Sequence, residues 1–109
     1  MNKATAGQDA VRRIREMEAA LDECVGAVEA LSRQLDRMEA LRDEMTRLFA
    51  YYGSEDWHDD RALDEQGLLP DGLRRGVLSE DLVYDVITDL RDAAFRMLEQ
   101  ATDILKNRI

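Results

Sequence analysis

The fold is decided by residues 9–52, which read DAVRRIREMEAALDECVGAVEALSRQLDRMEALRDEMTRLFAYY. Apolar side chains recur there at alternating steps of three and four residues, as they do along one face of an α-helix. The seam comprises Ile14, Met17, Leu21, Cys24, Val28, Leu31, Leu35, Met38, Met45, Phe49 and Tyr52. Arg42 interrupts it, and Leu41 and Leu48 widen the stripe at that point. We therefore predict one long helix over 9–52, with Asp9 as its N-cap, residues 1–8 frayed and no break at Gly26.

A second amphipathic pattern follows a connector of about 25 residues, which is long for a link between two helices. Ser79 is a candidate N-cap, and the apolar residues after it again recur every three or four positions. They are Val83, Ile87, Leu90, Ala94, Met97, Ala101 and Ile104, broadened by Leu82, Val86, Phe95, Leu98 and Leu105. This predicts a C-terminal helix over 79–107, in which Leu78 packs on Val83 as a hydrophobic staple.

The connector, residues 53–78, has the signals of a folded segment. Gly53 suits the left-handed position after a helix, and Ser54 can cap a short helix over 55–65. Pro70-Asp71-Gly72 is a turn signal. The sequence thus predicts an all-α fold, a long antiparallel coiled-coil-like hairpin in a single domain, 1–109. Because the stripes are wider than one partner helix needs, we expect the hairpins to dimerise into a bundle.

Composition restricts the classes of partner. The 109 residues carry a formal charge of -9, and no segment is basic apart from Arg12, Arg13 and Arg15, which we expect on a solvated face. Binding to nucleic acid or to a membrane is therefore disfavoured. Cys24 is the only cysteine, so no internal disulfide is possible. The N-terminus has no apolar signal-peptide core, and we expect a cytoplasmic protein.

Aromatic and basic residues gather around the connector. Trp57, Tyr52 and Tyr84 lie near one end of the predicted hairpin, together with Arg74 and Arg75. These residues could form a small core that pins the connector. They could equally form a partner-binding surface, because Trp, Tyr and Arg dominate binding energy at interfaces.

The acidic start of the short helix offers one candidate metal site. Glu55 and His58 have the i, i+3 spacing by which helices present two metal ligands. Such sites need a second copy of the motif, and this chain has a single histidine. We expect no metal or cofactor, and we find no nucleophile motif or phosphate-binding loop. The chain is therefore not expected to be an enzyme.

Several strings in the centre resemble a known family. They are YYGSEDW at 51–57, RGVLSED at 75–81 and VYD at 83–85, with Leu69-Pro70 and IREM at 14–17. Over roughly residues 11–106 the chain is similar to the bacterial domain-of-unknown-function family 4298. The resemblance implies a small acidic helical bacterial protein, and it implies no activity.

These observations favour a non-enzymatic protein–protein interaction or adaptor module that forms a homo-oligomer, with a dimer favoured. Its candidate partner-binding residues are Trp57, Arg74, Arg75, Tyr52 and Tyr84. Two alternatives stay open. One is a metal- or ligand-binding protein that uses Glu55 and His58, and the other is an acidic mimic of nucleic acid that binds a DNA-interacting protein.

Overall fold

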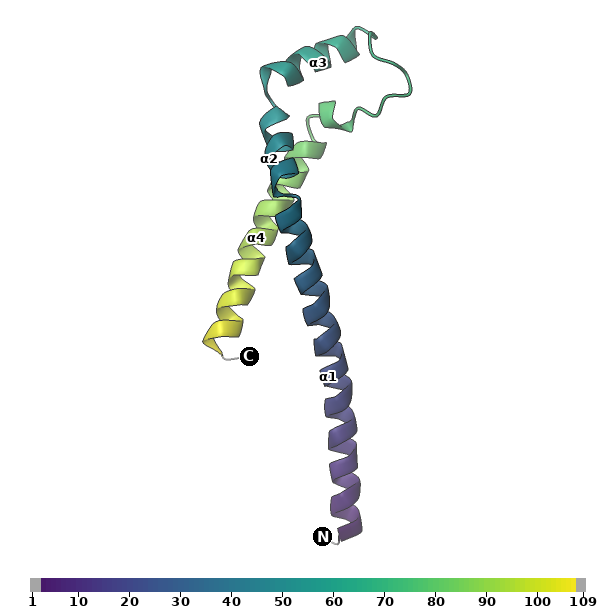
Figure 1. Cartoon of the computed structure of the whole chain (residues 1–109), viewed down its shortest axis with the longest axis vertical. Helices are drawn as coiled ribbons and strands as arrows, with labels where there is room; N and C mark the ends of the chain where they lie inside the picture. The colour runs from purple at the N-terminus through teal and green to yellow at the C-terminus, as the bar shows by residue number, and fades with distance from the viewer. Residues whose placement is uncertain (1–2, 108–109) are drawn as a thin grey trace. The chain divides into compact units, whose positions relative to one another are not determined.

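A computed structural model describes residues 3–107. Its elements are α1 (Lys3–Ala40), α2 (Arg42–Tyr51), α3 (Glu55–Glu65), the 3-10 turn η1 (Gly76–Leu78) and α4 (Leu82–Lys106) (Figure 1). No strand occurs among these residues, which confirms the all-α prediction. The chain divides into two compact units, one ending at Arg42 and the other starting at Asp43.

The first unit is essentially the helix α1. It begins at Lys3, so the prediction of a frayed segment up to residue 8 is wrong for the residues described; Met1 and Asn2 lie outside them. Asp9 is not the N-cap, because it lies inside the helix, where its carboxylate accepts a hydrogen bond from Arg12 at 3.1 Å. The helix runs through Gly26 without a break, as predicted.

The prediction of one helix over 9–52 is also wrong at Leu41. This single turn residue separates α1 from α2, which ends at Tyr51. The amide of Leu41 still donates to the carbonyl of Arg37 at 3.0 Å, so the hydrogen bonding is only locally disturbed. The interruption coincides with Arg42, the one seam position that lacks an apolar side chain.

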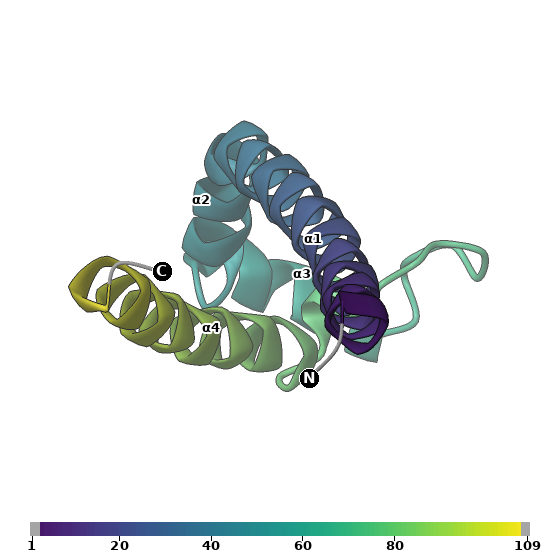
Figure 2. The same ribbon diagram turned by 90° about the horizontal axis from the view of Figure 1, so that it is seen from below.

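The second unit contains α2, α3, η1 and α4. The short helix has the predicted bounds, and the Ser54 hydroxyl caps it by accepting from the Trp57 amide at 3.2 Å. Gly53 and Gly67 flank α3 with φ of 78° and 70°, the left-handed conformation that glycine adopts without strain. In Figures 1 and 2 the loop between α3 and η1 projects away from α2 and α4.

The C-terminal helix starts three residues later than predicted. Ser79 does accept backbone hydrogen bonds, from Asp81 at 3.2 Å and from Leu82 at 3.4 Å, but residues 79–81 form a turn. Regular helix therefore begins at Leu82 and ends at Lys106. The residue at the N-cap position of α4 is Asp81, which makes no side-chain capping bond, and the Ser79 hydroxyl supports the turn that leads into the helix.

The core of the second unit is small and lies where the connector meets α4. Its buried apolar residues are Trp57, Leu78 and Val83. Burial of both Leu78 and Val83 agrees with the predicted staple, and η1 contacts both α3 and α4. The connector is thus folded, as predicted. The connector brings the start of α4 back to α2. Leu48 of α2 and Val83 of α4 therefore line the same hollow.

Candidate interaction surface

Trp57 is the centre of the connector. It is 4% exposed, and its indole nitrogen donates to the carbonyl of Val77 at 2.8 Å. The rings of Tyr52 and His58 meet it edge-on at 5.3 and 5.0 Å, and the Arg61 guanidinium lies 4.8 Å from its ring centroid. Such aromatic and cation–π contacts add to the burial of a large apolar ring. Trp57 therefore holds α3 against η1.

Two tyrosines tie α2 to the connector. The Tyr52 hydroxyl donates to the backbone carbonyl of Glu80 at 2.8 Å, which joins the end of α2 to the turn before α4. The Tyr51 hydroxyl donates to the carboxylate of Asp60 on α3 at 2.6 Å. Loss of water contact, and then the hydrogen bond and negative charge of Asp60, raise the pKa of Tyr51 to about 12.

Arg75 organises the projecting loop. Its guanidinium pairs with the carboxylate of Asp64 and donates to the backbone carbonyl of Pro70 at 2.8 Å. Weaker bonds reach the carbonyls of Asp71 at 3.4 Å and Leu73 at 3.3 Å. A fixed fork of five N–H donors is well suited to several backbone acceptors at once. The side chain is therefore occupied within the connector.

Arg74 differs from its neighbour. It is exposed, and its guanidinium makes no hydrogen bond or ion pair among residues 3–107. It lines a hollow of about 330 Å³, whose other lining residues come from α2, η1 and α4. They are Leu48, Gly76, Val77, Leu82, Val83 and Val86. We call this site the Arg74 hollow.

The walls of the Arg74 hollow are apolar and accessible. Val77 is 42% exposed, Leu82 is 56% exposed and Val86 is 49% exposed. A second hollow of about 260 Å³ lies between α3 and the loop, where Tyr51, Asp60, Leu69 and Leu73 are among its lining residues. Arg74 lines this hollow too, so its positive charge stands beside both.

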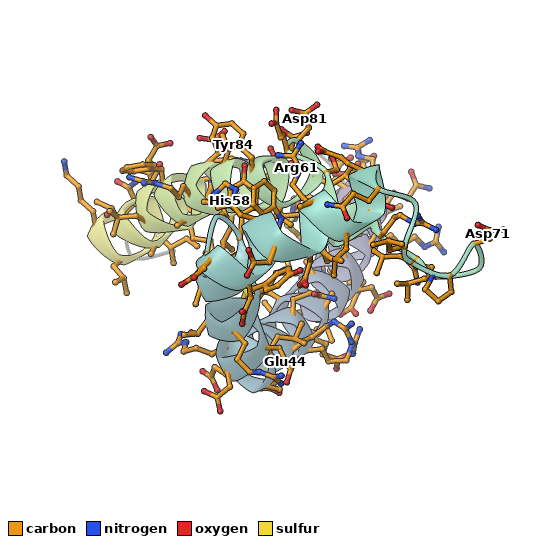
Figure 3. The ribbon with its side chains drawn as sticks, turned by 90° about the horizontal axis from the view of Figure 1, so that it is seen from above. Glu44, His58, Arg61, Asp71, Asp81 and Tyr84 are labelled. Atoms are coloured by element: carbon orange, nitrogen blue, oxygen red, sulfur yellow. The ribbon has the colours of Figure 1, made fainter. Side chains whose placement is uncertain are left out.

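The five predicted site residues differ in their burial and in their bonding. Trp57 is buried, and Tyr52 and Arg75 are bonded within the connector. Tyr84 is 57% exposed on α4, and only Arg74 of the five lines the Arg74 hollow. Figure 3 shows Tyr84 and Asp81 at the start of α4, close in that view to His58 and Arg61 of α3, with Asp71 at the tip of the loop.

Sequence reasoning missed the apolar walls of the hollow as a site. Leu48, Leu82 and Val86 were recognised only as residues that widen the two seams. The signal that could have found them is their position, because all three lie just outside a seam and within eight residues of the connector. Val77 carries no such signal, since its place depends on how η1 packs.

Glu55 and His58, the alternative metal ligands, belong to no larger cluster of metal-ligating side chains among the residues described. His58 is exposed and packs edge-on against Trp57. No group of three or more His, Cys, Asp or Glu side chains within residues 3–107 is arranged to hold a metal ion.

A family model described as Domain of unknown function (DUF4298) matches residues 14–100. The chain belongs to this DUF4298 family. The match contains α2, α3, η1 and the whole connector, so the Arg74 hollow lies inside the DUF4298 region. No curated protein and no solved structure matches the chain. Among the helices described, none is both long enough and apolar enough to cross a membrane.

Proposed function

We propose that this DUF4298 protein is a non-enzymatic adaptor, which binds a short segment of a partner protein in the Arg74 hollow. The observation that supports the proposal is an exposed apolar hollow with a guanidinium at its edge that is unpaired among the described residues. A volume of about 330 Å³ is at the lower end of the range for small-molecule sites and has room for one or two side chains.

The chemistry of the hollow defines the segment. The methyl and isobutyl groups of Val77, Leu82 and Val86 favour an apolar side chain, because its burial removes apolar surface from water on both partners. Arg74 favours a carboxylate, which a guanidinium binds through two parallel hydrogen bonds. The preferred ligand is therefore a peptide in which Leu, Ile or Phe stands beside Asp or Glu.

Self-association is the second part of the proposal. The apolar faces of α1 and α4 carry many large side chains that are about half exposed or more, among them Met17, Leu21, Phe95 and Leu98. An adaptor that assembles through such helices presents more than one copy of its binding hollow, which strengthens attachment to a repeated partner. The lone Cys24 fits a reducing compartment, and a bacterial cytoplasm is the setting we propose.

A selection from a random displayed peptide library tests the binding function. The bait is the full chain, compared with Arg74→Glu and with the matched charge reversal Arg91→Glu on the exposed side of α4. We expect the selection to enrich peptides with the apolar–acidic pattern. These peptides should bind the Arg91→Glu variant as tightly as wild type. Their affinity for the Arg74→Glu variant should be at least tenfold lower. Peptides that bind all three proteins equally, or a selection without enrichment, would contradict the proposal.

A further inference from the structure

The apolar seam of α1 has no cover within its own unit. The helix has 38 residues and is about 57 Å long, and none of its residues is buried. The exposed fractions are 59% for Ile14, 63% for Met17, 53% for Leu21, 66% for Val28 and 54% for Leu31. Helices in proteins are stabilised mainly by packing of their apolar face, so this seam requires a partner.

The rest of the chain is too short to supply it. The helix α4 has 25 residues, or about 38 Å, and it starts beside the end of α2, where Tyr52 bonds to Glu80. Whatever its arrangement, α4 can therefore reach along α2 and at most roughly the last fifteen residues of α1. Ile14, Met17 and Leu21 lie beyond that reach, so another molecule must cover them.

The heptad positions favour a two-stranded partner. Ile14, Leu21, Val28 and Leu35 occupy position a, and Met17, Cys24, Leu31 and Met38 occupy position d. In a parallel coiled coil, β-branched residues at a and Leu at d favour two strands, and Ile14, Val28 and Leu31 fit this pattern. The seam is broken at the next a position, Arg42, which is also where the first compact unit ends.

The charges beside the seam set the direction of the partner. Arg13 is at position g and Glu18 is at the following position e, and neither makes an ion pair among the described residues. In a parallel, in-register pair, each Arg13 faces Glu18 of the other copy. In a fully overlapping antiparallel pair, Arg13 would instead face Leu41, and Glu18 would face Ser32.

The other charges between Arg12 and Met38 do not oppose this pairing. Arg12, Arg15, Glu16, Asp22 and Glu23 occupy positions b, c and f, which point away from a coiled-coil partner. Gly26 is also at f, and a Cβ built there meets nothing within 4 Å. The remaining g and e positions of the first three heptads include Ala20 and Val25, which extend the apolar contact.

We propose that α1 pairs with α1 of a second copy as a parallel, in-register coiled coil, in which Arg13 of each copy binds Glu18 of the other. This deepens the self-association in the proposed function and names its partner, register and direction. Cys24, at position d, then lies opposite its own counterpart, close enough for a disulfide between the two copies.

Oxidative cross-linking of the full chain tests the register and direction. We expect mild oxidation to link Cys24 of two copies. The double variant Cys24→Ser, Met17→Cys moves the thiol one heptad towards the N-terminus, to another d position, and should be linked equally well. The control Cys24→Ser, Arg33→Cys moves the thiol to an outward f position and should give little dimer. An antiparallel pair would leave the Met17→Cys variant unlinked, and this result would overturn the proposal.

Charge exchange provides a readout that does not use cysteine. We expect sedimentation equilibrium to give twice the 12.5 kDa mass of the chain, and Arg13→Glu to raise the dimer dissociation constant roughly tenfold. The double exchange Arg13→Glu, Glu18→Arg should restore dimerisation. A wild-type monomer, or a double exchange no better than Arg13→Glu, would contradict the pairing. A monomer that binds peptide would refute the coiled-coil pairing and support the adaptor function. A cross-linked dimer that binds no peptide would support the pairing and refute the adaptor function.

Discussion

The indole nitrogen of Trp57 lies 2.8 Å from the carbonyl oxygen of Val77, twenty residues later in the chain, and donates a hydrogen bond to it. This bond connects the core residue of α3 to a wall of the Arg74 hollow. The hollow therefore depends on a packed connector, and residues that hold the connector can be distinguished by experiment from residues that face a ligand.

Trp57→Ala should destabilise the second unit strongly. It removes a buried ring and the bond to Val77, and truncation of a buried aromatic residue typically costs about 3–5 kcal/mol. Denaturant unfolding followed by circular dichroism measures this change in the free energy of unfolding. Leu68→Ala is the matched control, because Leu68 is 65% exposed and its loss should change stability by less than about 0.5 kcal/mol. Equal effects of the two variants would be evidence against a Trp57 core.

The two neighbouring arginines should behave in opposite ways. Arg75→Ala removes the bonds to Asp64 and to the carbonyl of Pro70, so it should loosen the loop and speed its amide hydrogen exchange. Arg74→Ala should leave both exchange and stability unchanged while it weakens peptide binding. If Arg74→Ala loosens the loop as much as Arg75→Ala does, Arg74 has a structural role that our assignment lacks.

Tyr51 should give the chain a distinct alkaline transition. Its pKa in the folded protein is raised to about 12 from 10.0, so folding favours the protonated phenol. The stability that this shift contributes is present below pH 10.0 and is lost as the pH rises through about 12. Tyrosinate absorbance should show one late-titrating phenol in wild type that is missing in Tyr51→Phe. A late phenol that persists in Tyr51→Phe would assign it to another residue.

Three glycines should respond differently to alanine. Gly26 lies in open space inside α1, so Gly26→Ala should stabilise the helix by roughly 0.5–1 kcal/mol. Gly53 and Gly67 have positive φ, where a Cβ is strained, so alanine there should cost about 1–2 kcal/mol. Thermal unfolding of the three variants checks the order. Stabilisation by Gly53→Ala would contradict the left-handed turn between α2 and α3.

Local signals explain which parts of the fold could be predicted from the sequence. The helix α3 begins at the Ser54 cap and its two following acidic residues, and it ends before Gly67. These signals act within a few residues, and the bounds of α3 were predicted correctly. The interruption at Leu41 and the late start of α4 depend on small differences in backbone bonding at one turn, which a periodic pattern does not report.

The site was harder to predict because its contacts are non-local. Arg74 and Arg75 are adjacent and alike in sequence, yet Arg75 is bonded to four groups of the connector and Arg74 to none of residues 3–107. What separates them is the position of Asp64 and of the loop carbonyls after folding. The burial of Trp57 likewise depends on η1, twenty residues away.

The central claim, binding in the Arg74 hollow, is tested most directly by methyl NMR of the full chain titrated with a selected apolar–acidic peptide. We predict that the methyl signals of Leu48, Val77, Leu82 and Val86 shift with a common dissociation constant. The signals of Leu98 and Leu105, far along α4, should stay unchanged, and Arg74→Glu should abolish the shifts. Shifts confined to Leu98 and Leu105, or shifts that persist unchanged in Arg74→Glu, would contradict the account.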